Sequence, residues 1–262
     1  MPIAQLDRTV LSLKGETVCE FLNGLITNSL SDTLTFAALL TPQGKIIADF
    51  FIHKQSCTHL LIETPAKFGK ALMTRLKMYK LRAQITIEDV SDTHTVYAFW
   101  NGEGDVGHPD PRHTDLGHRL ITDDLLSVEH EANDYDLHRL ALAIPDSIWD
   151  FDSEQVFPSD TNMDKLHGID YKKGCFIGQE VASRMHRKTE VRKRMRGIKL
   201  SGSAQIGDDL MAGTRKIGTV KHVNRDYGIA LIRLDRLAQI QDAVTLNDSP
   251  VTIMEPPYGH TP

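Results

Sequence analysis

The last third of the chain constrains the fold most, because its apolar residues fall into short runs separated by turn residues. From Met195 onward, runs of two to seven residues alternate with Gly, Asn and Asp. This spacing is typical of short antiparallel strands in a small sheet or barrel. The runs cover residues 198–200, 210–211, 217–223, 229–234, 244–246 and 251–254. We therefore predict a C-terminal β-barrel domain over residues 195–262.

Residues 1–194 carry the mixed patterns of an α+β region. Strand-like stretches alternate with segments whose apolar residues recur every three or four positions, the period of a helix with one buried face. One such helix is predicted to begin at Thr64-Pro65, where a capping hydroxyl precedes a proline in the first turn. Residues 42–44 predict a hairpin turn. We expect two packed subdomains with an internal boundary near residues 90–120.

The size and composition of the chain indicate an ordinary folded protein of 262 residues. The first residues lack the basic flank and apolar run of a signal peptide, and no apolar stretch approaches the roughly 18 residues that span a bilayer. We therefore expect a cytoplasmic protein with no membrane partner. Cys19, Cys57 and Cys175 are odd in number and widely separated, which favours free thiols over a disulfide framework.

Positive charge is concentrated in one segment of an otherwise acidic chain. The net charge is −5, yet residues 172–196 carry nine basic residues and two acidic ones. Clustered positive charge favours anionic ligands. Residues 184–196 could contact phosphates of RNA or, through arginine, the carboxylates of an acidic ligand. The segment lacks the aromatic residues that stack on bases, so direct binding of nucleic acid is the less favoured prediction.

The string Lys173-Gly174-Cys175-Phe176-Ile177-Gly178-Gln179-Glu180 is the strongest candidate for a functional site. Two glycines, which permit close approach of a ligand, bracket a thiol just before a predicted helix over residues 177–187. A helix N-terminus and nearby ammonium groups favour the thiolate, so Cys175 is a candidate reactive group. The alternatives are that Cys175 is a small core residue, that Gln179 and Glu180 only cap the helix, and that Lys173 is a solvated charge.

The same eight residues resemble the signature of the YgfZ family, whose members are related to the glycine-cleavage T protein. The similarity extends over most of the chain. It includes residues 15–28 (GETVCEFLNGLITN), the turn at 41–45, the element at 139–145, and the segments 158–162 and 218–233.

The resemblance implies a T-protein-like, multi-domain ring of mixed and antiparallel sheets and helices, plus the small barrel, around a central hole that binds tetrahydrofolate. The implied role is folate-dependent assembly or repair of iron-sulfur client proteins, including radical enzymes that modify tRNA. Activity in that family rests on the residue matching Cys175, and Lys173 matches the lysine two positions earlier. We expect these two as catalytic residues, with a one-carbon or thiol redox step as the possible chemistry. The candidate folate contacts are Asn28, Asp89, Arg139, Gly174, Gly178, Gln179, Glu180 and Arg184.

The chain also departs from the T protein. Nothing matches the folate-holding "YTGEDG" segment, which disfavours the alternative of an aminomethyltransferase or methyltransferase. Asp89-Val90-Ser91 is the nearest match to the catalytic aspartate, and a turn residue is an equal reading. An RNA-binding module using residues 184–196 is a further alternative. Within the loop 102–118, residues 108–118 contain three histidines and two aspartates but no metal-binding spacing, so we predict a flexible polar loop and no metal site.

Overall fold

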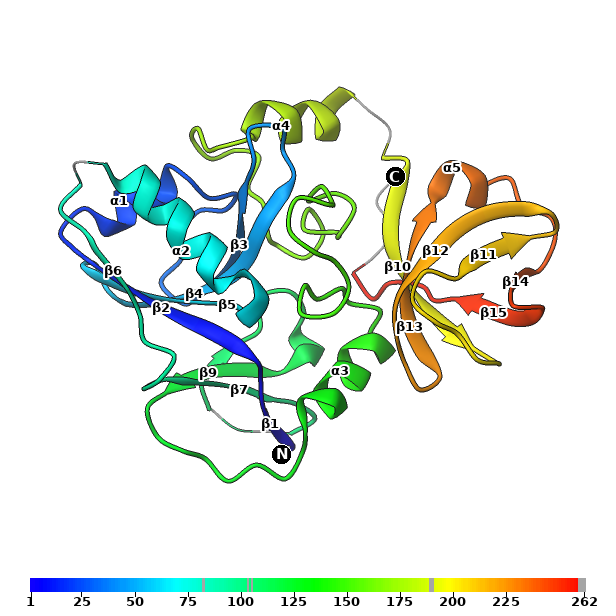
Figure 1. Cartoon of the computed structure of the whole chain (residues 1–262), viewed down its shortest axis with the longest axis horizontal. Helices are drawn as coiled ribbons and strands as arrows, with labels where there is room; N and C mark the ends of the chain where they lie inside the picture. Colours follow the sequence, from blue (N-terminus) through cyan, green and yellow to red (C-terminus); the bar gives the residue numbers. More distant parts are fainter. Residues whose placement is uncertain (82, 103, 105, 189–190, 259–262) are drawn as a thin grey trace.

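The computed structural model describes the whole chain except residues 82, 103, 105, 189–190 and 259–262, and arranges it as two sheets with their helices beside a barrel (Figure 1). The larger open sheet is antiparallel, in the order β3-β4-β5-β2-β6. Its strands are β2 (Arg8–Lys14), β3 (Leu34–Leu40), β4 (Ile46–Ser56), β5 (His59–Pro65) and β6 (Thr86–Asp89). Because β3 and the first eight residues of β4 are buried throughout, this sheet is covered on both faces.

Helices α1 (Val18–Asn23) and α2 (Ala66–Lys80) cover one face of this sheet (Figure 1). Phe68, Leu72 and Leu76 of α2 are buried, as their spacing predicts. The predicted helix start at Thr64-Pro65 is wrong by one residue, because the N-cap is Pro65 and α2 begins at Ala66. Thr64 is still in β5, opposite Thr9 of β2, and its hydroxyl donates to the carbonyl of Asp49 (2.9 Å). The hydroxyl of Thr64 is therefore used in a contact between strands and does not cap the helix.

The smaller sheet has the order β1-β7-β9-β8 and packs with helix α3 (Ala132–Ala141). Its strands are β1 (Ile3–Gln5), β7 (Thr95–Phe99), β8 (His108–Pro109) and β9 (His118–Thr122). The prediction of a flexible loop over residues 102–118 is wrong in part. Residues 108–109 form β8, residues 114–116 form a 3₁₀ turn, and Asp110 and Arg112 are buried.

Turns connect α3 to helix α4 (Gln179–Lys188), which lies at the far end of the larger sheet from α3 (Figure 1). The last six strands then close into an antiparallel barrel in the order β10-β13-β12-β11-β14-β15. They are β10 (Lys193–Leu200), β11 (Asp209–Ala212), β12 (Arg215–Asn224), β13 (Tyr227–Arg233), β14 (Val244–Leu246) and β15 (Ser249–Ile253), with the short helix α5 (Leu234–Leu237) after β13.

The barrel has a core of its own, centred on Ile198, Ile217 and Ile232. The expected fold class, α+β with mixed or antiparallel sheets, helices and a C-terminal barrel, is confirmed. Within the described residues, no helix combines the length and apolar character needed to cross a membrane.

Candidate functional site

The signature segment forms a strap that leads into α4 and exposes its thiol. Cys175 is exposed, whereas the next residue, Phe176, is only 6% exposed and belongs to the cluster between the sheet and the barrel. Ile177 packs against the other core, with α1 and α2. The alternative that Cys175 is a core residue is therefore excluded. Phe176 and Ile177 pack into the cores, and the thiol does not.

The two glycines of the signature have different surroundings. Gly178 has a φ of +77°, and a Cβ atom there would lie 2.6 Å from the carbonyl oxygen of Thr41 in the hairpin turn. Glycine is required at this position for both reasons. At Gly174 a Cβ atom would meet nothing within 4 Å. Gly174 therefore leaves open space beside the thiol. Packing within the chain does not require a glycine at this position.

Lys173 does not present its ammonium group to solvent. Its Nζ donates to three backbone carbonyls, those of Asn23 (2.8 Å), Ile26 (2.8 Å) and Asn28 (2.9 Å). Burial lowers the pKa of Lys173 to about 8, because a desolvated ammonium is less stable than a solvated one. The reading of Lys173 as a solvated charge is therefore wrong. Gln179 bends back so that its side-chain amide donates to the carbonyl of Gly174 (3.3 Å).

Three of the expected folate contacts outside the signature have other partners. Asn28 donates through Nδ2 to the carbonyls of Phe36 (3.0 Å) and His167 (2.7 Å). Asp89 is exposed at the end of β6, where its carboxylate accepts from the backbone N–H (3.0 Å) and hydroxyl (2.6 Å) of Ser91. These contacts make Asp89 a turn residue, the alternative reading of its sequence context.

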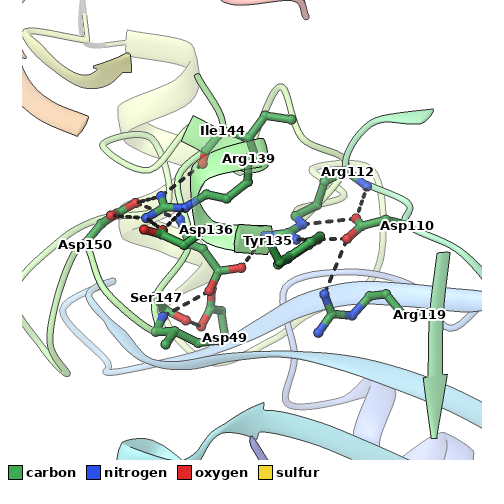
Figure 2. A network of polar contacts seen from close by, with 12 residues as sticks. Asp49, Asp110, Arg112, Arg119, Tyr135, Asp136, Arg139, Ile144, Ser147 and Asp150 are labelled. Carbon is green, nitrogen blue, oxygen red and sulfur yellow. Dashed lines mark hydrogen bonds and ion pairs between the residues drawn. The ribbon is translucent and has the colours of Figure 1, made fainter. Parts of the chain in front are cut away.

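Arg139, the third of these contacts, is fully buried and bonded to its own chain (Figure 2). Its guanidinium donates to Asp136 (2.5 and 2.8 Å), to Asp150 (2.5 and 2.9 Å) and to the carbonyl of Ile144 (3.2 Å). These bonds use all five N–H donors of the side chain. Arg139 is consequently structural, whereas Glu180 and Arg184 are exposed on α4.

A buried network of ion pairs joins the two open sheets. Glu63 of β5 pairs with Arg8 of β2 (2.6 Å) and with Arg119 of β9 (2.6 and 2.8 Å). Arg112 and Arg119 both point toward Asp110 (Figure 2), and Arg112 donates to it at 2.8 and 3.0 Å. Burial alone would raise the pKa of Glu63, but Arg119 and Arg8 hold it well below its ordinary value. Such pairs tolerate burial because each charge has a charged partner.

Asp49 belongs to the same network, but the pKa of its carboxyl is raised and not lowered. It lies in β4 between buried apolar residues, is 7% exposed and accepts a hydrogen bond from Ser147. Burial, together with the negative charge of Asp146, raises the pKa of Asp49 to about 6. Strongly perturbed carboxyl groups of this kind cluster at functional sites. The sequence reasoning missed Asp49, although an isolated acid inside the apolar run IIADFFI was a visible signal.

The network continues from α3 to the barrel. Asp136 accepts hydrogen bonds from the side chains of His222 (2.7 Å) and Asn224 (2.9 Å), both on β12. The ring of His222 also stacks on Trp149, with centroids 6.0 Å apart. The barrel is therefore held to the α+β region by polar contacts as well as by the shared apolar cluster that contains Phe176.

A cleft of about 380 Å³ lies between α4, residues 155–160 and the barrel. Its apolar lining includes Phe157, Met185 and Leu231, and Lys45 and Arg192 are among the cations around it. The described residues that line it include none of the eight expected folate contacts.

Among the described side chains of the segment 184–196, the basic residues do not form one exposed patch. Arg184, Arg187, Arg192 and Lys193 are exposed, but Arg194 is 8% exposed and pairs with Asp164 at 2.7 Å. Across the residues that the structure describes, no group of three or more His, Cys, Asp and Glu side chains is arranged to hold a metal ion.

Three comparisons relate this chain to known proteins. Residues 192–259 match the family model of the CAF17 C-terminal β-barrel domain. The chain superposes on the glycine cleavage system aminomethyltransferase T from Bartonella henselae with a TM-score of 0.77, covering 98% of this chain and 86% of that protein, at 11% sequence identity. The fold is therefore that of the aminomethyltransferases, with a closed six-stranded barrel at its C-terminus.

The similar sequences are iron-sulfur cluster assembly factors. The IBA57 homologue of Mycosarcoma maydis is 29% identical over 72% of this chain and 54% of its own length, and that of Phaeosphaeria nodorum is 31% identical over 77% and 56%. Human IBA57 is 24% identical over 88% of this chain and 76% of its own length. The chain spans about half the length of the first two relatives.

These names correct one expectation and make another less specific. The relatives are named as mitochondrial proteins, which contradicts the expected cytoplasmic location. The similar proteins are named IBA57 and not YgfZ, so the resemblance to the YgfZ family is one to a related group. What the comparisons support directly is similarity to IBA57-type assembly factors, on the aminomethyltransferase fold and with a CAF17-type barrel.

Proposed function

We propose that this chain is an assembly or repair factor for iron-sulfur proteins and that the Cys175 thiol is its working group. The observation that carries the proposal is the exposed position of Cys175 between Lys173, which is hydrogen-bonded to the chain, and Phe176, which is buried. The chain is also similar in sequence to IBA57-type factors. Thiolates are the usual protein ligands of iron-sulfur clusters. Because one thiolate is only one of the four ligands that a cluster takes, the other ligands come from a client or partner protein that meets the strap.

The chain's own groups prepare the thiol for that encounter. The strap keeps Cys175 at the surface, and Gly174 leaves open space beside it. Gln179 starts α4 four residues after the thiol, so the strap is continuous with a helix on that side. A partner protein can therefore approach the sulfur without rearrangement of the core. The radical enzymes that modify tRNA are among the clients we propose.

Complementation with a matched pair of cysteine variants tests the proposal. Cys175→Ala and Cys57→Ala each remove one exposed thiol, and only the first lies in the strap. In cells lacking their own IBA57-type factor, we expect wild type and Cys57→Ala to restore iron-sulfur enzyme activity and Cys175→Ala to fail at equal protein levels. Full restoration by Cys175→Ala would refute the role of this thiol.

We propose further that the cleft beside α4 accepts a reduced folate. Its volume of about 380 Å³ suits a small ligand, its apolar residues suit a flat aromatic body, and Lys45 and Arg192 suit glutamate carboxylates. The donors of Arg139 and the carboxylate of Asp89 have partners within the chain, so they do not fit the roles that the family resemblance implied.

Calorimetric titration with 5-formyltetrahydrofolate tests this part separately. The double variant Lys45→Ala/Arg192→Ala should weaken binding by more than about tenfold, since each charged hydrogen bond contributes about 1.5–3 kcal/mol. Arg215→Ala, which removes an exposed cation of the barrel away from the cleft, should bind as wild type does. Equal affinity in the double variant and wild type would place the ligand elsewhere.

A further inference from the structure

Hydrogen bonds join two segments that are far apart in the sequence, at the start of the thiol strap. Residues 167–173 lie against residues 23–29, which begin at the last residue of α1. Asn28 donates to the carbonyl of His167 (2.7 Å), and the hydroxyl of Thr27 donates to that of Gly168 (2.7 Å). The backbone N–H of Asp170 in turn donates to the carbonyl of Thr27 (2.9 Å). These bonds define a seam between residues 23–29 and 167–173.

Asp170 and Lys173 cross this seam in opposite directions. The carboxylate of Asp170 accepts from the hydroxyl of Ser29 (3.0 Å) and from the backbone N–H groups of Lys172 (2.8 Å) and Lys173 (3.2 Å). The ammonium of Lys173 returns across the seam to the carbonyls of residues 23, 26 and 28. Charge-assisted bonds of this type are about twice as strong as neutral ones. The seam is therefore strongest two residues before the thiol.

The three carbonyls leave the ammonium no free proton to donate. An ammonium has three N–H donors, and Lys173 makes three bonds of 2.8–2.9 Å. The same Nζ lies 5.5 Å from the ring centroid of Phe176, on the other side of the thiol. Phe176 is itself fixed in the core. Cys175 thus lies between two immobilised neighbours while its own side chain remains exposed.

We propose that Lys173 is a positioning residue that holds Cys175 at the surface by fixing the strap to the seam, and that it does not exchange protons with a substrate. The proposal rests on the proposed function of Cys175 for its biological meaning. Asn23 is the last residue of α1, so its carbonyl is one of those a helix leaves without an internal partner. The lysine satisfies that carbonyl and two more from the loop that follows. Both sides of the seam are ordered by the same ion.

Hydrogen–deuterium exchange of neighbouring lysine variants measures the seam directly. Lys173→Met removes the half-buried ammonium, and Lys172→Met removes an exposed charge one residue away. At pH 7, amides of residues 24–29 and 170–176 should exchange more than about tenfold faster in Lys173→Met, because several charged hydrogen bonds are lost. Lys172→Met should exchange at the wild-type rate. Lys173→Gln, which retains two N–H donors, replaces Lys173→Met if the latter does not fold.

A pH profile separates positioning from a merely structural contact. As pH rises through about 8, the ammonium of Lys173 loses its proton in the folded chain, whereas a solvated lysine keeps its proton up to about 10.5. Opening of the seam above pH 8 therefore takes up a proton, so protection of the seam, corrected for intrinsic exchange, should rise between pH 7 and 9 in wild type and stay constant in Lys173→Met. In the complementation assay, Lys173→Met should lose activity that Lys172→Met retains.

The opposite result would be unchanged seam protection in Lys173→Met with a shifted pH midpoint for alkylation of Cys175. That outcome would make the lysine an electrostatic partner of the thiol and would overturn the proposal. The exchange data do not depend on iron-sulfur chemistry. If Cys175→Ala supports iron-sulfur enzymes but Lys173→Met still frees the seam, the proposed function fails and the positioning of the strap stands.

Discussion

Asp49 offers the sharpest quantitative test of the buried network, because its substitution should stabilise the protein. The pKa of its carboxyl is raised from 3.8 to about 6 by burial and by Asp146. Each pKa unit corresponds to about 1.4 kcal/mol, so ionised Asp49 lowers the free energy of unfolding by about 3 kcal/mol at neutral pH. The side-chain amide introduced by Asp49→Asn would resemble the protonated carboxyl in shape, and its oxygen could still accept from Ser147.

The pH dependence fixes the sign of the effect. Because the pKa of Asp49 is higher in the folded state than in the unfolded state, its stabilising contribution is complete below pH 4 and is lost as pH rises through about 6. Asp49→Asn should therefore be more stable than wild type by about 3 kcal/mol at pH 7.5 and by about half of that at pH 5. Urea unfolding followed by circular dichroism at both pH values measures the difference.

Asp146→Asn provides the control of opposite sign. Burial alone would raise the pKa of Asp146, but Arg112, Arg8 and Arg139 lower it below its ordinary value. Removing this charge breaks the buried ion pair of Asp146 with Arg112 (2.9 Å), although Arg112 keeps Asp110, and should destabilise the protein by about 3–5 kcal/mol at pH 7.5. If Asp49→Asn were no more stable than wild type at pH 7.5, or if the difference did not change between pH 5 and 7.5, the assigned ionisation of Asp49 would be refuted.

Two further predictions concern the strap. Gly178→Ala should lower the free energy of unfolding by about 1–3 kcal/mol, because a φ of +77° strains any residue other than glycine and the new Cβ would meet the carbonyl of Thr41. Gly174→Ala, whose Cβ would meet nothing, should leave the free energy of unfolding unchanged. Urea unfolding measures both. Iodoacetamide followed by peptide mass spectrometry should modify the exposed Cys57 and Cys175 before Cys19, which is partly buried and donates to a carbonyl (3.4 Å); faster modification of Cys19 would contradict the packing of α1.

Local patterns were enough to predict the barrel and the main helices. The alternation after Met195 and the stripe of Phe68, Leu72 and Leu76 each report burial on one face, which short-range spacing encodes. The start of α2 was mispredicted because the hydroxyl of Thr64 bonds to β4, a partner fifteen residues away. A capping signal cannot distinguish a local acceptor from one supplied by a neighbouring strand.

The site could be predicted only in part for a related reason. The signature indicated Cys175 as a candidate reactive thiol just before a helix, since the start of a helix is a local property, but the alternative of a core residue stayed open. The partners of Lys173 lie about 150 residues earlier in the chain, and no pattern in the signature itself predicts them. The ion pairs of Asp110 and Arg112 were hidden similarly, because Pro and His around them gave the segment the composition of a loop.

The contact between Asp136 and the barrel also bears on the order of folding. Asp136 is fully buried, yet its partners His222 and Asn224 lie more than eighty residues further along the chain. During synthesis, α3 therefore leaves the ribosome well before these side chains exist. Its carboxylate should stay hydrated until β12 arrives, so docking of the barrel becomes a late step of folding. A truncation before residue 222 would leave that carboxylate without two of its partners.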